Sequence, residues 1–321
     1  MNRRKLLRRS LVGVSLIGAN LSSRTMAETP VPSPGKRKFT IDLTPGAIGV
    51  KAKPDELIDL AGASGFESIQ PNASFLASLD ASQRKEFADA LQANGLTWGA
   101  AGMPVDFRKD EATFHSGLKE LPGVAAALQD AGVTRIGTWL MPYHPELTYL
   151  ANFHQHVDRL GQVTKILADH GLRFGLEYVG TKALWTTGPF PFLHSMAETK
   201  ELIAEIDQPT LGFILDSWHW FTAGETAEDI LTLTNNDIIA CDLNDAPVGI
   251  PTDELIDSSR ELPAATGVID TAPFLKALVT LGYDGPVRAE PFNQPLRELD
   301  DEPAAKATAT AIREAISKAG L

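Results

Sequence analysis

The sequence predicts a closed (β/α)₈ barrel, or TIM barrel, formed as a single domain behind an N-terminal export segment. From residue 38 onward, short apolar segments alternate with longer amphipathic ones, and eight such pairs follow one another. Strands that alternate with helices indicate a parallel sheet. Eight units in about 250 residues are enough to close that sheet into a barrel. No glycine-rich nucleotide fingerprint follows any of the eight strands, which disfavours an open doubly wound sheet.

The first 27 residues have the composition of an export signal. A basic stretch at residues 3–9 precedes an apolar stretch at 11–19, and small residues lead to a predicted cleavage site near Ala27. Arg8-Arg9-Ser10-Leu11-Val12 resembles a twin-arginine signal, with a general secretory signal as the alternative. The apolar stretch is far shorter than the roughly 20 residues that span a bilayer. We therefore predict a periplasmic or exported protein that is not held at the membrane once its signal is removed.

The barrel domain is expected to cover residues 38–321, after a proline-rich, polar linker at 28–37. The predicted strands are 39–43, 67–70, 97–101, 135–140, 173–177, 212–216, 238–243 and 287–290. The predicted helices are 54–64, 82–94, 118–131, 147–170, 196–206, 226–233, 271–281 and 303–319. Several of them end at a glycine, which is typical of a left-handed helix cap: Gly65, Gly95, Gly132, Gly171 and Gly282.

Charge and cysteine content limit the partners of this chain. The full chain carries a net charge of −12; residues 1–27 contain six bases and no acid, which leaves 23 bases against 41 acids and a net charge of −18 from Glu28 onward. Such a surface repels phosphate backbones and anionic lipids, so we expect no nucleic-acid partner. Cys241 is the single cysteine, so an internal disulfide is impossible. The sequence leaves a homo-oligomer open.

Acidic residues end four consecutive predicted strands, at Glu177, Asp216, Asp242 and Glu290. In such barrels the active site lies where the strands end and the loops to the helices begin. Four carboxylates meeting at one mouth would repel one another unless a cation lay between them. A divalent metal is the simplest compensation, and a network of arginine and lysine side chains is the alternative.

These strand ends resemble the xylose isomerase-like TIM-barrel superfamily, which includes sugar isomerases and epimerases. The resemblance covers most of residues 38–320 and is specific in the C-terminal half. The motifs are Leu176-Glu177, Leu215-Asp216-Ser217-Trp218-His219, Asp242-Leu243-Asn244-Asp245 and Ala289-Glu290-Pro291-Phe292. It implies that Glu177, Asp216, Asp242 and Glu290 hold one metal ion and that Glu177 and Glu290 are the catalytic acid/base pair.

Asp242 departs from the family pattern, which has a histidine at this position. If Asp242 ligates, the site has only oxygen ligands, which favour Mn²⁺ or Mg²⁺ over Zn²⁺. Cobalt is a further metal that the resemblance implies. His219, which the resemblance implies contacts substrate or metal, could instead take the place of Asp242.

The resemblance implies proton abstraction beside a carbonyl of a sugar or keto-sugar, through an enediolate that the metal would stabilise. The resemblance and the apolar faces of sugars suggest further substrate contacts from aromatic and polar side chains near strand ends. These candidates are His219, Arg288, Asn244, Trp185, Trp218, Lys182 and His144. For each tryptophan, packing between helix and barrel is an equal alternative, and Arg288 could instead neutralise the acids.

Two other functions remain open. The same proton abstraction can eject a β-substituent, which would make the protein an exported lyase or hydratase of 3-keto-glycosides or inosose-like substrates. A non-catalytic sugar-binding barrel would need the aromatic residues but not the paired glutamates. AP endonucleases belong to the same superfamily, but the stretch 246–260 contains no histidine and the chain is acidic, so a nuclease is disfavoured.

Overall fold

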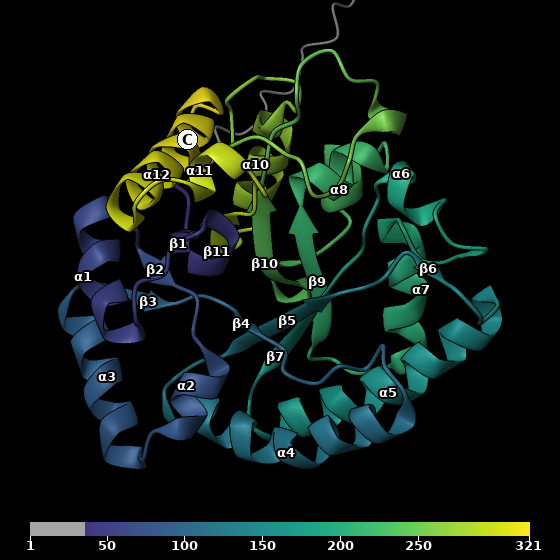
Figure 1. The fold of residues 1–321 in the computed structure, drawn as a ribbon, viewed down its shortest axis with the longest axis horizontal. Coiled ribbons are helices and arrows are strands. Elements are labelled where there is room, and N and C mark those ends of the chain that lie inside the picture. Colours follow the sequence, from purple (N-terminus) through teal and green to yellow (C-terminus); the bar gives the residue numbers. More distant parts are fainter. Residues whose placement is uncertain (1–35) are drawn as a thin grey trace, which may run out of the picture. The chain divides into compact units, whose positions relative to one another are not determined.

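Parallel strands curl around a central axis in residues 36–321, the part of the chain that the computed structural model describes (Figure 1). The strand order is β3-β2-β1-β11-β10-β9-β7-β5-β4. The bounds are β1 (Thr40–Leu43), β2 (Ser68–Ile69), β3 (Thr97–Trp98), β4 (Ala101–Gly102), β5 (Arg135–Trp139), β7 (Arg173–Glu177), β9 (Leu211–Asp216), β10 (Ile238–Leu243) and β11 (Pro286–Ala289).

The sheet closes because β3 and β4 are two halves of one strand. They lie at opposite ends of the strand order, yet only Gly99 and Ala100 separate them in the chain. β3 pairs with β2, and β4 pairs with β5. A single segment therefore joins both ends of the sheet, and eight strand positions surround the axis. The predicted (β/α)₈ barrel is confirmed, and each of the eight predicted segments contains a strand.

The long helices surround the barrel (Figure 1). They are α1 (Pro54–Ser64), α3 (Ala81–Ala93), α4 (Glu111–Asp130), α5 (Tyr149–Asp169), α7 (Met196–Ile206), α10 (Thr271–Thr280) and α12 (Asp301–Lys318). All five glycines that were predicted as helix caps have positive φ. α4 begins seven residues earlier than predicted, because the Asp110 side chain accepts a hydrogen bond from the Thr113 backbone and caps an extra two turns.

Short elements lie in the loops, and of these only α9 falls within a predicted helix. They are α2 (Ala73–Ser78), α6 (Lys182–Trp185), α8 (Ser217–Thr222), α9 (Ala227–Ile230), α11 (Gln294–Arg297), the 3₁₀ turns η1 (Pro45–Ile48), η2 (Asn235–Asp237) and η3 (Thr252–Glu254), and the strands β6 (Tyr143–His144) and β8 (Phe190–Pro191). The predicted helix at 226–233 shrinks to the single turn of α9. β6 and β8 form an antiparallel pair outside the barrel. Most of these elements shape the mouth of the barrel.

Small residues let the barrel interior close around one large side chain. Ile214 of β9 packs with Ala100 and Ala240 inside the barrel. A Cβ at Gly137 of β5 would lie 2.4 Å from the Ile214 side chain, and one at Gly175 of β7 would lie 2.9 Å away. Glycine at these two positions therefore makes room for Ile214, and the filled interior gives the strand ends a rigid base.

The predicted signal peptide, 1–27, and nearly all of the predicted linker, 28–37, lie outside the described residues. Within residues 36–321, none of the helices combines the length and the apolar character that crossing a bilayer requires.

Candidate active site

Four neighbouring strands bring their acidic ends to one side of the barrel mouth. β7, β9, β10 and β11 are adjacent and parallel, so their carboxyl ends lie along the same rim. Glu177 ends β7, Asp216 ends β9, Asp242 lies near the end of β10, and Glu290 directly follows β11. Asp242 stands opposite Asp216 in the strand register. The sequence-predicted convergence of these acids therefore exists in the fold.

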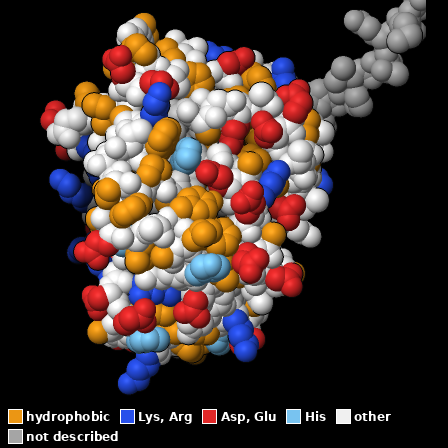
Figure 2. Space-filling view, turned by 90° about the vertical axis from the view of Figure 1, so that its right-hand side faces the viewer, with side chains coloured by type: hydrophobic (Ala, Val, Ile, Leu, Met, Phe, Trp, Pro, Cys, Tyr) orange, Lys and Arg blue, Asp and Glu red, His pale blue; other side chains and the backbone are white. Residues whose placement is uncertain are grey.

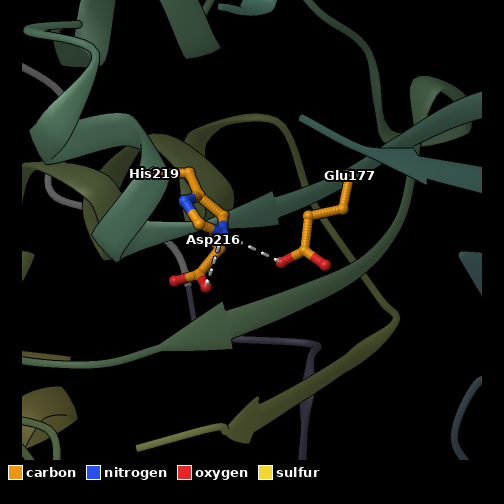
Figure 3. Close-up of side chains that lie close together, drawn as sticks. All are labelled: Glu177, Asp216 and His219. Atoms are coloured by element: carbon orange, nitrogen blue, oxygen red, sulfur yellow. Dashed lines mark ion pairs between the residues drawn. The ribbon is translucent and has the colours of Figure 1, made fainter. Parts of the chain in front are cut away.

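Glu177, Asp216 and His219 form the tightest group of potential metal ligands (Figure 3). One ligand atom from each lies within 4.8 Å of the other two. His219 Nε2 lies 3.8 Å from Glu177 Oε1 and 3.8 Å from Asp216 Oδ2. His219 reaches this position because α8 begins directly after Asp216, whose Oδ1 accepts a 2.8 Å hydrogen bond from the Trp218 backbone. The strand-to-helix turn thus brings the Asp216 carboxylate and the His219 imidazole together, although three positions separate them in the sequence.

Glu177 Oε1 is a buried polar atom without a hydrogen-bond partner among the described residues. A buried carboxylate oxygen that lacks a donor is unfavourable by about 1–3 kcal/mol, and more if it is charged. Two carboxylates and an imidazole are ligands that Zn²⁺, Mn²⁺ and Co²⁺ accept. Glu177, Asp216 and His219 therefore fit a divalent metal.

Arg260 is the main cation of the site, and the sequence analysis did not identify it. Its buried guanidinium donates from Nη1 to Asp216 Oδ2 at 2.7 Å and lies 3.7 Å from Glu290 Oε2. Nη2 lies 3.4 Å from His219 Nε2 and donates to Asp257 Oδ1 at 2.9 Å. The guanidinium thus occupies the space that a metal held by Asp216 and His219 would share. It would have to withdraw for the metal to bind.

Asp242 is engaged by its own arginine. Arg288 Nε donates to Asp242 Oδ1 at 2.7 Å, and Arg288 Nη2 donates to Oδ2 at 3.1 Å. This paired geometry uses both carboxylate oxygens, so Asp242 offers less to a metal than His219 does. Arg288 is buried, and its position matches the neutralising role that the sequence left open. The site therefore combines a candidate metal group with part of an arginine network.

Asn244 links two of the acidic strand ends by hydrogen bonds. Its Nδ2 donates to Asp216 Oδ1 at 2.9 Å, and its Oδ1 accepts from the Glu290 backbone N–H at 3.0 Å. Both polar atoms of the amide are therefore taken up by protein groups. Asn244 therefore positions Asp216 and Glu290, while its second amide N–H is left as a candidate donor to a substrate.

Burial raises the pKa values of the three carboxyl groups. The pKa of Glu177 lies well above its usual value, because the group is buried and the charges of Glu290, Asp242 and Asp216 oppose its ionisation. Burial raises the pKa of Glu290 to about 7, with Asp242 adding to the shift, and that of Asp216 to about 6 against the influence of Arg260. Groups that titrate near neutral pH suit general acid and base catalysis.

His219 is neutral at ordinary pH in this environment. Burial, followed by the charge of Arg260, lowers its pKa to about 3. A neutral imidazole is the form that ligates a metal. The sequence placed His219 either at the substrate or at the metal, and its position between Glu177 and Asp216 favours the metal.

Asp42 is a further buried acid, and the sequence analysis did not identify it. It lies in β1 and accepts a 2.6 Å hydrogen bond from Ser68 Oγ, while Thr44 Oγ1 lies 3.4 Å away. Burial raises the pKa of Asp42 to about 7. Gly99 lies against it, because a Cβ there would be only 2.3 Å from Asp42 Oδ1. A lone acid within a short apolar strand gave no pattern by which to single it out.

The remaining predicted substrate contacts lie in three different places. Trp218 is fully buried and donates from Nε1 to Thr181 Oγ1, with Arg260 stacked 5.2 Å from its ring. Lys182 pairs with Asp253, and Trp185 stacks on His194 with ring centroids 4.6 Å apart. These two line a cavity of about 340 Å³.

His144 lines a different cavity, of about 510 Å³, on the side of β5. It therefore does not join the group at Glu177. Packing describes Trp218 better than substrate contact, while Lys182, Trp185 and His144 remain candidate contacts at the edges of the mouth.

A comparison with protein families identifies a match over most of the chain. The model described as "Xylose isomerase-like TIM barrel" matches residues 58–315. An inosose isomerase of Bacillus subtilis is 23% identical over 213 residues, which cover 65% of this chain and 72% of that protein. A 3-dehydroshikimate dehydratase of Pseudomonas aeruginosa is 30% identical over 142 residues, 44% of this chain but only 21% of the dehydratase.

Solved structures share the fold over nearly the whole described chain. A xylose isomerase domain protein from Alicyclobacillus acidocaldarius superposes with a TM-score of 0.77 at 28% identity, covering 88% of this chain and all of that one. The IOLI protein, whose structure contains a bound zinc atom, superposes with a TM-score of 0.70 at 20% identity, covering 88% and 98% of the two chains.

Proposed function

The chain belongs to the xylose isomerase-like TIM-barrel family, and from this membership and the site geometry we propose that it is a metal-dependent isomerase or epimerase of a sugar or keto-sugar. The observation that carries the proposal is the meeting of Glu177, Asp216 and His219 at one point, with Glu290 beside them. Relatives that isomerise an inosose or dehydrate a dehydroshikimate support an enzyme acting on hydroxylated carbonyl compounds.

We propose that Glu177, Asp216 and His219 hold the metal. When bound, the metal would polarise the carbonyl and hydroxyl oxygens beside the reacting carbon. The expectation against zinc depended on a set of oxygen ligands alone, and His219 supplies a nitrogen that suits zinc, manganese and cobalt alike. The zinc atom of the IOLI structure is consistent with this set.

The two glutamates are proposed to move the proton. Glu290 is half-buried with a pKa raised to about 7, so near neutral pH a large share of it is ionised and can accept a proton from carbon. Glu177 is the proposed partner that returns the proton to the neighbouring position; in the metal-free site its pKa lies well above its usual value. In the metal-free arrangement Arg260 faces both groups, and its charge favours their ionised forms.

Elimination is the second candidate reaction. The dehydratase relative supports it, because loss of a β-substituent follows the same proton abstraction. On this alternative the substrate is a 3-keto-glycoside or an inosose-like compound. The residues and their roles up to the loss of the proton are unchanged.

Solvent exchange at carbon tests the proposal for either outcome. Purified protein supplied with Mn²⁺ or Zn²⁺ is incubated in D₂O with D-fructose, D-psicose, D-tagatose, a keto-inositol and the keto-disaccharide lactulose, and deuterium incorporation is followed by NMR. We expect uptake into at least one compound, its loss on adding a chelator, and its loss in Glu177→Gln. Glu254→Gln, an exposed glutamate of η3, is the matched control and should exchange normally.

A non-catalytic sugar-binding barrel predicts different results in the same experiment. Such a protein would bind sugar without any deuterium uptake, and Glu177→Gln would leave binding unchanged. Absence of uptake across the whole panel, with the metal bound, would contradict the proposed chemistry.

A further inference from the structure

A cavity of about 510 Å³ opens beside the candidate active site, and no proposed metal ligand lines it. Its walls come from the loops after β4 and β5, from β6, and from the first turns of α5. The side chains that matter here are Arg108, Trp139, Tyr143, His144, Asn152 and Gln155. The volume is within the usual range for small-molecule pockets, about 300–1,000 Å³.

The cavity borders the strand that carries Glu177. Trp139 ends β5 and stands opposite Glu177 in the register of the β5–β7 pair. The next backbone N–H, of Leu140, donates to the Glu177 carbonyl at 2.8 Å. A molecule bound at the Glu177 carboxylate therefore has this cavity as its neighbour along the rim.

A fixed aromatic ring forms one wall. Trp139 ends β5 and is 39% exposed. The Arg108 guanidinium lies 4.4 Å from the Trp139 ring centroid and donates to the Trp139 carbonyl, which holds the residue in place. Exposed aromatic rings that are fixed in position suit the apolar C–H faces of sugars.

Neutral hydrogen-bonding groups form the other walls. His144 Nδ1 accepts from the backbone N–H groups of Glu146 and Leu147, at 3.0 and 2.8 Å, so the proton of the neutral ring is on Nε2. His144 therefore offers one N–H donor to a ligand. Asn152 and Gln155, one helical turn apart on α5, add amide groups.

Unsatisfied acceptors lie behind this surface. The His156 Nδ1 lies 2.8 Å from the Asn152 carbonyl and donates to it, so its Nε2 is an acceptor. Nε2 of His156 and Oδ1 of Asn152 are both buried and lack a hydrogen-bond partner among the described residues. Both need a donor, and hydroxyl groups or water supply one.

The charge of the cavity is nearly balanced. Arg108 Nε lies 3.6 Å from Asp106 Oδ1, which leaves Lys109 as the additional positive group at the rim. On the face over β6 and α5 to α7, hydrophobic side chains and histidines gather between scattered charges (Figure 2). An uncharged ligand with many hydroxyl groups matches these features better than a strongly anionic one.

We propose that this cavity is a second sugar subsite, and that the substrate is a disaccharide or glycoside whose further ring lies between Trp139 and His144. The identification of the first ring as the reacting one depends on the proposed function. The presence of a sugar-binding cavity beside Trp139 does not.

Binding to a variant without turnover tests this subsite apart from the chemistry. Isothermal titration calorimetry of Glu177→Gln compares D-glucose and D-fructose with maltose, cellobiose, trehalose, lactose and sucrose. We expect at least one disaccharide to bind about tenfold or more tightly than either monosaccharide. His144→Ala and, separately, Gln155→Ala on the same background should abolish most of that advantage. Gln155→Ala tests the subsite even if loss of His144 distorts its loop.

His154→Ala is the matched control, since His154 is an exposed histidine of α5 and does not line the cavity. In this control the disaccharide should still bind about tenfold or more tightly than either monosaccharide. The proposal is overturned if no sugar of the panel binds, if disaccharides bind no better than monosaccharides, or if the cavity variants behave like His154→Ala. Failure of the deuterium experiment alone would overturn the proposed reaction and leave this result standing.

Discussion

Arg260 is the buried cation that faces several acids of the site at once. Asp216, Asp257 and Glu290 all face its guanidinium, and their charges raise the pKa of Arg260 even though burial opposes the shift. Buried acids without a positive partner are strongly destabilising. The arginine therefore stabilises the metal-free fold, and it would compete with the proposed metal for Asp216 and His219.

Replacing Arg260 should separate these two effects. In Arg260→Gln without metal, we expect the free energy of unfolding to fall by about 3–5 kcal/mol, because the acids lose their counterion. Added Zn²⁺ or Mn²⁺ should bind more tightly than in the wild type and recover much of the stability. Denaturant unfolding with and without metal measures both.

Arg260→Lys keeps the charge and provides a folded comparison if the glutamine variant is too unstable. Arg297→Gln, an exposed arginine of α11, should behave like the wild type. Equal metal affinity in the wild type and Arg260→Gln would show that the guanidinium does not compete with the ion.

Asp42 should give the protein a measurable dependence of stability on pH. Burial raises its pKa to about 7, so the folded state holds a proton that the unfolded state releases near pH 4. Below about pH 4 this proton contributes its full stabilisation of the folded state. The stabilisation is lost as the pH rises from about 4 through about 7. Asp42→Asn mimics the protonated form and should exceed the wild type by about 2–4 kcal/mol at pH 8, with little difference at pH 4.

Urea unfolding between pH 4 and pH 8 measures this difference, with Asp59→Asn on the exposed side of α1 as control. If wild type and Asp42→Asn lost stability in parallel over this range, Asp42 would not be the titrating group.

At the residue scale, the sequence identified the acids but not their partners. Glu177, Asp216 and Glu290 were predictable because each ends an apolar strand, and the ends of parallel strands share one rim. Arg260 was not, because it comes from an irregular loop whose path no periodicity describes. His219 was among the candidates, but its choice over Asp242 required the contact between Asp242 and Arg288.

At the element scale, the interruption between β3 and β4 lies directly against the buried Asp42 of β1. Gly99 lies at the interruption and leaves space for the Asp42 carboxylate. The sequence predicted one continuous strand at 97–101, because periodicity does not show where a side chain from another strand needs room. The strong strands and long helices were predictable, whereas one-turn helices and two-residue strands are too short to produce a pattern.

A methyl group at Gly99 should destabilise this junction. In Gly99→Ala the new Cβ would lie 2.3 Å from Asp42 Oδ1, so the strands must shift, and we expect a loss of about 1–3 kcal/mol. Gly102→Ala in β4 is the control, since a Cβ there meets nothing within 4 Å. Thermal unfolding compares them. Equal stability of the two variants would mean that β1 and β3 adapt freely.

At the scale of the whole molecule, metal binding should appear as added stability. A ligand that binds only the folded state at about 100 times its dissociation constant adds about 2.7 kcal/mol. For a domain of this size, that corresponds to a rise in melting temperature of about 5–10 °C. Differential scanning calorimetry with EDTA, Mn²⁺ or Zn²⁺ measures the shift, which Glu177→Gln should largely remove. A melting temperature that no divalent ion changes would argue against the proposed metal site.

A barrel that contains its own counterion can complete its folding before any ion arrives. Loading with the proposed metal would then be an exchange in which the Arg260 guanidinium leaves the site, so its rate would depend on the movement of a loop as well as on diffusion. Newly made molecules would persist in a folded, inactive form and mature later. We expect ion supply, more than the rate of synthesis, to determine how much of the pool is active at a given time.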